Sequence, residues 1–218
     1  MPIPLLIVGA VVAVGLLGIG GAAAAIIATF AKKLSGKRVA ILGRQTIGKT
    51  TLLHFLRAGK IPDHTRNTVD PDEGGTFSLE IGGKSVGFRV PKDLPGNDGL
   101  GYSDWKEAFT GADYVWYLFR SDLVAQEDKA EVALVKGHLD MFRQWMDAGS
   151  APKIILIGTW ADQDPGFERD PKQFRRDVAA ASPIKVGAVK LNNAGLVIGA
   201  LDNDDNAVTL MKSLGRRL

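Results

Sequence analysis

One eight-residue segment, GRQTIGKT at residues 43–50, constrains the fold more than any other part of the chain. It has the spacing G-x-x-x-x-G-K-[ST] and lies between a short apolar run, residues 37–42, and a helical pattern, residues 49–58. In such a strand–loop–helix unit the glycines let the backbone approach an anion, which successive N–H groups and the helix dipole then stabilise. The segment therefore predicts a phosphate-binding P-loop, with Lys49 on the β- and γ-phosphates and the Thr50 hydroxyl on Mg²⁺. Its context argues against the alternative, a chance match in a glycine-rich loop.

The composition divides the chain into two parts. Residues 1–31 carry no charged side chain, so all 27 basic and 24 acidic residues follow them. The absence of cysteine excludes disulfides and thiolate metal sites and suits a reducing compartment. A net charge of +3 without a block of like charge gives no indication of a nucleic-acid partner. We therefore expect an apolar segment with a basic flank, residues 1–36, and one globular domain, residues 37–218.

The apolar segment has the composition of a membrane anchor. Residues 3–31 are apolar or small throughout, and a transmembrane helix needs about 20 such residues. A cleaved signal peptide and a buried or self-associating helix are the alternatives, although no basic residue precedes the run. Lys32, Lys33, Lys37 and Arg38 follow it, which predicts a single-pass protein whose domain faces the cytoplasm. The many small residues of the run would permit close helix packing, which leaves a homodimer open.

The globular part reads as an α/β domain of the P-loop NTPase type. Runs at residues 76–81 and 85–90 alternate around Gly82-Gly83-Lys84 and predict an antiparallel hairpin. Buried strands alternating with helices predict a mainly parallel sheet with helices on both faces. The further strands are expected at residues 37–42, 112–119, 153–157, 184–191 and 196–201, and the helices at 49–58, 104–109, 126–148, 171–181 and 203–214.

Two more segments follow predicted strands at the sheet edge where the P-loop lies. Asp93-Leu94-Pro95-Gly96 comes directly after the hairpin, and Gly158-Thr159-Trp160-Ala161-Asp162 follows the strand at residues 153–157. Open α/β sheets bind ligands at this edge, where the strands have their carboxyl ends. Together with the P-loop, and in this order, the segments resemble the motifs of the Ras-like small GTPase family over residues 37–218.

The resemblance implies that GTP or GDP and Mg²⁺ are the ligands. Asp93 would hold Mg²⁺ through water beside Thr50, and the Gly96 N–H would bond the γ-phosphate. Thr68, with Thr65 as the fallback, would join the Mg²⁺ when the γ-phosphate is present. The phosphate-binding set would comprise Gly43, Arg44, Gln45, Thr46, Ile47, Gly48, Lys49, Thr50 and Thr51.

The guanine motif departs from the family pattern. Thr159-Trp160-Ala161-Asp162 stands where N-K-x-D is usual, but the aspartate is retained. A carboxylate at Asp162 would accept the two N–H donors of guanine, and adenine offers no such pair. Trp160 would stack on the base in place of the lysine stem. In the last loop, Gly199-Ala200-Leu201, the Ala200 N–H would meet the guanine oxygen and Leu201 would line the site.

The resemblance also implies which residues act in hydrolysis. Lys49 would stabilise the phosphates, and Asn97 stands where the family has a water-orienting glutamine. Asparagine is one methylene shorter, so intrinsic hydrolysis should be slow or depend on another group. Arg44 or Arg66 could supply positive charge from the same chain.

These features favour a membrane-anchored GTP-binding protein that hydrolyses GTP slowly and uses nucleotide-controlled switch loops to recruit an unidentified protein partner. One span followed by a GTPase domain is similar in arrangement to the signal recognition particle receptor β subunit. A GTP-bound scaffold that does not hydrolyse, suggested by Asn97, is one alternative. An ATP-using P-loop phosphotransferase, suggested by the altered guanine motif, is the other.

Overall fold

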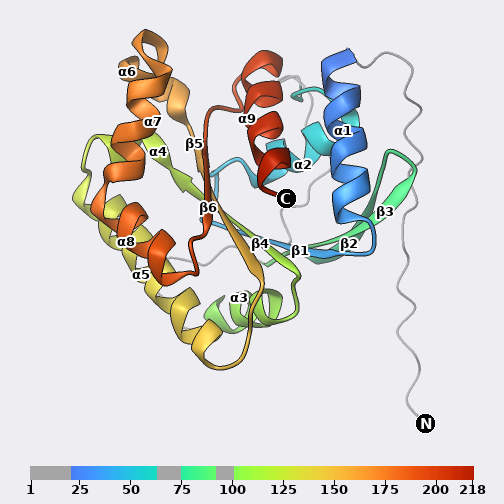
Figure 1. Cartoon of the computed structure of the whole chain (residues 1–218), viewed down its shortest axis with the longest axis horizontal. Helices are drawn as coiled ribbons and strands as arrows, with labels where there is room; N and C mark the ends of the chain where they lie inside the picture. Colours follow the sequence, from blue (N-terminus) through green and yellow to red (C-terminus); the bar gives the residue numbers. More distant parts are fainter. Residues whose placement is uncertain (1–20, 63–74, 92–100) are drawn as a thin grey trace.

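A twisted β-sheet crosses the middle of the molecule, with helices on both sides (Figure 1). The computed structural model describes residues 21–62, 75–91 and 101–218. Its strands are β1 Arg38–Leu42, β2 Gly75–Ile81, β3 Lys84–Val90, β4 Tyr114–Arg120, β5 Lys153–Thr159 and β6 Gly195–Ile198. Their order in the sheet is β2-β3-β1-β4-β5-β6. All neighbouring pairs are parallel except β2 and β3, so the expected parallel sheet with one antiparallel hairpin is confirmed.

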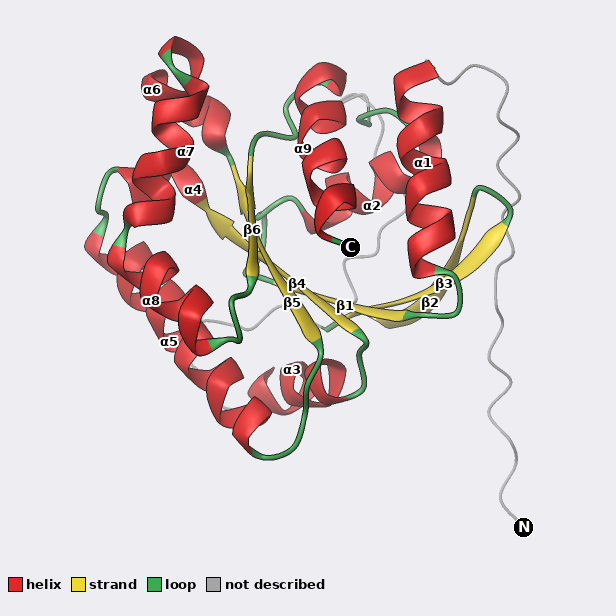
Figure 2. Cartoon of the chain, in the orientation of Figure 1, coloured by secondary structure: helices red, strands yellow, loops and turns green. Residues whose placement is uncertain are grey.

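The helices form a layer on each face of the sheet, as the secondary-structure view shows (Figure 2). They are α1 Gly21–Leu34, α2 Lys49–Ala58, α3 Gly101–Thr110, α4 Ser121–Ala125, α5 Lys129–Asp147, α6 Pro165–Arg169, α7 Pro171–Ala180, α8 Ser182–Lys190 and α9 Asp204–Arg217, with a short 3₁₀ turn at Ala161–Gln163. One core lies between the sheet and α1, α2 and α9, and a second lies between the sheet and α3, α5, α7 and α8. The parallel strands are buried on both faces for this reason.

Alternate residues of β4 enter the two cores. Trp116 and Leu118 point into the first, whereas Val115, Tyr117 and Phe119 point into the second. This alternation follows from the two-residue period of a strand. An uninterrupted apolar run such as YVWYLF is therefore compatible only with a central strand, which is where β4 lies.

The last eleven residues of the predicted transmembrane run, residues 21–31, belong to α1, which packs against the domain. Ile26, Ile27, Phe30 and Leu34 are all at most 5% exposed and share a core with β1, α2 and α9. The Phe30 ring meets the Trp116 ring edge to face, with 6.0 Å between centroids. Among the described residues, no helix is both long and apolar enough to cross a bilayer. The remainder of the run, residues 3–20, lies outside the described part of the chain, so the transmembrane span stays a prediction.

The strand expected at residues 184–191 is wrong, because this segment forms helix α8. Ile184, Gly187 and Leu191 are buried whereas Val186 and Val189 are exposed, which is a helical rather than a two-residue period. Gly187 allows the helix to lie close to α5, since a Cβ there would come 2.3 Å from Leu139 Cδ1. The apolar run is too short for its period to distinguish helix from strand.

The helix expected over residues 126–148 is shorter and has a separate turn before it. Asp128 caps α5 by accepting the Glu131 N–H at 2.8 Å, so the helix begins at Lys129. The preceding residues form α4, directly after β4. An aspartate at the N-cap satisfies one of the first N–H groups of the helix, which explains where α5 begins.

We predict that Phe30→Ala lowers the free energy of unfolding by about 3 to 5 kcal/mol, the usual cost of a buried phenylalanine. Thr29→Ala, on the exposed side of the same helix, is the matched control and should change it by less than about 0.5 kcal/mol. Urea unfolding of the full chain followed by tryptophan fluorescence measures both. Equal, small effects would show that α1 is not part of the core.

We predict that the buried His138 side chain makes the free energy of unfolding depend on pH in the acid range. Its Nδ1 lies 2.9 Å from the Tyr117 hydroxyl, and burial lowers its pKa from 6.5 to about 4. Burial raises the pKa of Tyr117 well above its usual value, so the hydroxyl keeps its proton and donates it to the neutral imidazole.

Because the folded-state pKa of His138 lies below the unfolded value, its contribution is complete above about pH 6.5 and is lost as the pH falls toward 4. The loss should amount to about 3 kcal/mol. The unfolding free energy of the wild type should therefore fall by that amount relative to that of His138→Asn as the pH is lowered from about 6.5 to 4. Parallel curves would contradict the assignment.

Candidate functional site

The P-loop joins β1 to α2 at the carboxyl end of the sheet, as its sequence predicts. Gly43, Thr46 and Gly48 all have positive φ, of 149°, 60° and 97°. A Cβ on Gly43 would lie 2.8 Å from the Leu118 carbonyl oxygen, so only glycine fits there. The loop thereby curls over the first turn of α2, whose opening N–H groups have no partner within the helix.

Lys49 lies at the start of α2, and its ammonium group points into the P-loop. Its Nζ donates to the carbonyl oxygens of Gly43, at 2.7 Å, and Arg44, at 2.8 Å, and the residue is only 9% exposed. Thr50 and Thr51, half-buried, follow in the same turn. The structure therefore concentrates a buried positive charge and the amino end of a helix in one loop, which is an environment that favours an anion.

The segment after β5 meets the P-loop directly. The Thr159 hydroxyl lies 2.9 Å from the Ile47 carbonyl oxygen and 3.3 Å from that of Phe119, so its single proton serves both acceptors. The Trp160 indole N–H donates to the Thr46 carbonyl oxygen at 3.2 Å. These hydrogen bonds span the end of β4, which separates β1 from β5 in the sheet.

Asp162 lies in the short turn that follows Trp160, the residue that contacts the P-loop. Its carboxylate is partly exposed and accepts the Gln163 side-chain amide at 2.5 Å. A carboxylate acceptor is therefore present in the turn after the Trp160 contact.

The loop after β6 lies beside the P-loop and the segment after β5. The Ala161 N–H donates to the Gly199 carbonyl oxygen at 3.3 Å, and the Gly199 N–H donates to Gly158 at 2.9 Å. Ala200 is buried, and a Cβ on Gly48 would lie 3.2 Å from Leu201 Cδ1. The P-loop, the segment after β5 and the loop after β6 are thus adjacent, whereas the predicted segment Asp93–Gly96 lies outside the described residues.

Several predicted site residues lie outside the described part of the chain. They include the Mg²⁺ ligand Asp93, the γ-phosphate contact Gly96, the catalytic Asn97, and Thr68 with its alternative Thr65. Among the predicted Mg²⁺ ligands the structure therefore describes only Thr50.

Arg120, which the sequence reasoning missed, supports Trp160. Its guanidinium lies 4.5 Å from the centre of the indole ring and is held by an ion pair with buried Asp122, whose Oδ1 accepts from Nε at 2.8 Å. Such cation–π contacts stabilise by about 0.5 to 2 kcal/mol. The position of Arg120, at the carboxyl end of a predicted strand, is a signal that could have identified it.

A second residue that the sequence reasoning missed, Glu131 of α5, contacts both the P-loop and the end of β4. One carboxylate oxygen accepts the Arg120 N–H at 3.0 Å, and the other lies 3.3 Å from Arg44 Nη1. Burial raises the pKa of Glu131, and the two arginines oppose that shift. Arg44 is therefore tied to α5 through its side chain.

Comparison with known proteins places the fold. No protein-family model matches the sequence, and no similarity to a curated protein is found. The structure is similar to Toc33 from Arabidopsis thaliana, studied as a dimerization-deficient R130A mutant, with a TM-score of 0.61 and 14% identity over 92% of this chain and 93% of that one. It is also similar to a GTP-binding protein from Sulfolobus solfataricus solved with GDP, with a TM-score of 0.51 and 12% identity over 82% of this chain.

The chain spans about half, 53%, of the length of the archaeal protein. At these identities the likeness establishes architecture. The mostly parallel six-stranded sheet and the P-loop of this chain are consistent with a P-loop GTPase fold.

We predict that Thr159→Val lowers the unfolding free energy by about 1 to 3 kcal/mol, because it leaves buried carbonyl oxygens without their donor. Thr159→Ser keeps the hydroxyl and is the matched control. Thermal unfolding of both variants should show the larger loss for valine. If serine cost as much as valine, the hydroxyl would not be what joins the two loops.

Proposed function

We propose that this chain binds guanine nucleotides and hydrolyses GTP slowly. The observation that carries the proposal is the contact between the P-loop and the Thr159–Asp162 segment, made through Thr159 and Trp160. This contact supports the proposal because it joins a cationic anion-binding loop to a segment whose carboxylate, Asp162, would accept the hydrogens of a base. The similar protein from Sulfolobus solfataricus, described as a GTP-binding protein and solved with GDP, supports the choice of nucleotide.

In this proposal the Lys49 ammonium gives up its hydrogen bonds to the Gly43 and Arg44 carbonyl oxygens when nucleotide binds, and donates instead to oxygens of the β- and γ-phosphates. The carbonyls of Gly43 and Arg44 show that its ammonium is already directed into the loop. The N–H groups of residues 43–51 provide the remaining donors. This arrangement fits a polyphosphate better than a single carboxylate, because one loop supplies several donors around one cation.

Guanine selection is assigned to Asp162, which would accept the N1 and N2 hydrogens that Gln163 now mimics. Trp160 would cover the base with one ring face, since Arg120 lies against the indole ring at 4.5 Å. Ala200 and Leu201 would close the other side of the pocket. The indole thus replaces a lysine stem as the apolar cover while its N–H bonds the P-loop.

Mg²⁺, when bound, would neutralise the phosphate charge, and the residues proposed to hold it are Thr50, Asp93 and Thr68. The Thr50 hydroxyl belongs to the same turn as Lys49 and fits this role by position. Asn97 is proposed to orient water weakly, so switch loops around Thr68 and Gly96 would respond slowly to hydrolysis.

Membrane attachment is the second half of the proposal. Because residues 21–31 pack in α1, the span would be formed by residues 3–20. Eighteen helical residues reach about 27 Å, close to the hydrocarbon thickness of about 30 Å. The basic residues after the run favour a cytoplasmic domain that recruits a protein partner. A homodimer remains a prediction.

The proposal is tested by reversing the base contact. Asp162→Asn replaces an acceptor by a donor, so the preference should move from GTP to xanthosine triphosphate, by about 100-fold in relative affinity. Competition for a fluorescent guanine nucleotide measures it. Equal affinity of the wild type for ATP and GTP would instead favour the phosphotransferase.

A measurement of GTP hydrolysis distinguishes a GTPase from a GTP-bound scaffold that does not hydrolyse. Single-turnover assays on the full chain should show slow phosphate release that Lys49→Ala removes without unfolding the protein. Lys106→Ala, a substitution of an exposed lysine on α3, is the control for loss of charge. Tight GTP binding with no phosphate release would favour the non-hydrolysing scaffold.

A further inference from the structure

A groove follows the edge of the sheet that β6 forms. It has a volume of about 600 Å³ and is lined by α7, which covers one face of the sheet, and by α9, which covers the other. Figures 1 and 2 show β6 between these two helices. Leu196, Val197 and Ile198 of the strand line the groove as well. Within the described part of the chain, β6 pairs only with β5, so its other side has no strand partner.

The backbone of β6 directs polar groups into this groove. The Gly199 N–H donates to the Gly158 carbonyl oxygen of β5 at 2.9 Å. Because alternate residues of a strand direct their N–H and C=O groups to opposite sides, those of Leu196 and Ile198 face the free edge. The Ile198 carbonyl oxygen agrees with this direction, since it accepts from Arg175 Nε at 3.2 Å. Such an edge can pair with another extended chain.

Three arginines give the groove a positive charge. Arg175 belongs to α7, and Arg216 and Arg217 belong to the last turn of α9. Among the described residues none of the three has an ion-pair partner, and no acidic side chain lines the groove. Asp204 and Asp205 lie in the first turn of α9, about 16 Å along the helix from the arginines.

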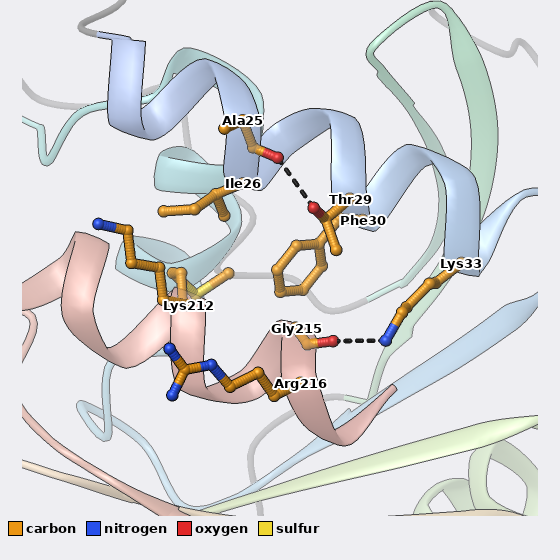
Figure 3. Close-up of a pocket in the computed structure, with 9 residues that line it drawn as sticks. Ala25, Ile26, Thr29, Phe30, Lys33, Lys212, Gly215 and Arg216 are labelled. Atoms are coloured by element: carbon orange, nitrogen blue, oxygen red, sulfur yellow. Dashed lines mark hydrogen bonds between the residues drawn. The ribbon is translucent and has the colours of Figure 1, made fainter.

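The α9 side of the groove is held in place by its neighbours. On the side away from β6, Lys33 of α1 donates to the Gly215 carbonyl oxygen at 2.9 Å, as Figure 3 shows. A Cβ on Gly215 would lie 3.3 Å from Phe30 Cε2, so α1 and α9 are in close contact. Toward β6, the Arg217 stem lies against Gly195, where a Cβ would come 3.5 Å from Arg217 Cδ. Such a preformed groove lowers the entropic cost of binding a ligand.

We propose that an extended, acidic segment of a partner protein binds in this groove by pairing with β6. Its backbone bonds the edge groups of Leu196 and Ile198, and its side chains alternate between the two faces of the sheet. An acidic side chain on one face then meets Arg175, and one on the other face meets Arg216 and Arg217. Because the edge is short, the ion pairs supply much of the affinity. This site depends on neither the nucleotide site nor the membrane attachment.

The charge and the strand edge together select this occupant. A second copy of the chain is disfavoured, because pairing of two β6 edges would bring the arginines of both copies together. A free phosphate would meet the arginines but would leave the N–H and C=O groups of the edge without a partner. An extended acidic polypeptide satisfies both features.

Peptide binding to the full chain tests the proposal. The probe is a capped, fluorescent six-residue peptide with two adjacent glutamates between valines. Its control has the same sequence and charge but is N-methylated at the four central residues, so neither backbone edge can pair. Fluorescence anisotropy should show that the probe binds at least about 10-fold more tightly than the control, and more weakly as salt is added. Equal binding of the two peptides would indicate an anion site only, and that result or no binding would overturn the proposal.

Amide hydrogen exchange locates the bound peptide. Saturating probe should slow exchange severalfold at Leu196 and Ile198, whose N–H groups face the groove. Exchange at Val197, whose backbone faces β5, should not change. Binding that leaves Leu196 and Ile198 unaffected would place the peptide elsewhere and overturn the site.

Two charge-matched pairs of substitutions test the arginines. Arg216→Gln with Arg217→Gln should weaken probe binding at least about 10-fold. Lys84→Gln with Lys106→Gln removes the same charge from exposed lysines of β3 and α3 and should leave the affinity unchanged. Circular dichroism melts establish that both variants fold. Equal effects of the two pairs would overturn the site, because binding would then follow net charge alone. Binding of GDP, measured in parallel, tests the proposed function separately.

Discussion

The site depends on the hydrogen bonds that join the loop after β5 to the P-loop. Thr159 and Trp160 donate to carbonyl oxygens of Ile47 and Thr46, respectively, across the end of β4. They join the two loops directly, although the strands that carry these loops are not neighbours in the sheet. In the proposed function, the P-loop would hold phosphate and the carboxylate of the attached loop would select the base. Arg120 contacts the Trp160 ring and Glu131 pairs with Arg44, so each side chain supports one of the two loops.

The same sheet also organises the N-terminal helix. α1 covers β2 and β3 beside α9, and its apolar face completes a core that α2 and α9 alone would leave open. The apolar character of residues 21–31 is thus explained by packing.

Much of this was accessible from the sequence, because local signals agreed with one another. The P-loop spacing, the two-glycine hairpin turn and the run of residues 114–119 each have one structural solution. The segment at residues 184–191, most of which forms α8, resembles a strand in sequence because its five apolar residues in eight suit either period. The close approach of Gly187 to Leu139, which only the helix satisfies, is a tertiary contact. Glu131 and Arg120 could not be paired with the loops from spacing alone. The sequence also could not predict that α1 packs in the core, because an apolar helix face has the same composition whether it contacts lipid or protein.

Whether the three joined loops form a site for guanine nucleotides can be measured by calorimetric titration of the full chain with GDP and with ADP, both in the presence of Mg²⁺, because the two ligands differ only in the base. We expect saturable binding of GDP at one site and binding of ADP at least 100-fold weaker, since adenine cannot satisfy a carboxylate acceptor. Equal affinities, or binding of neither nucleotide, would contradict it.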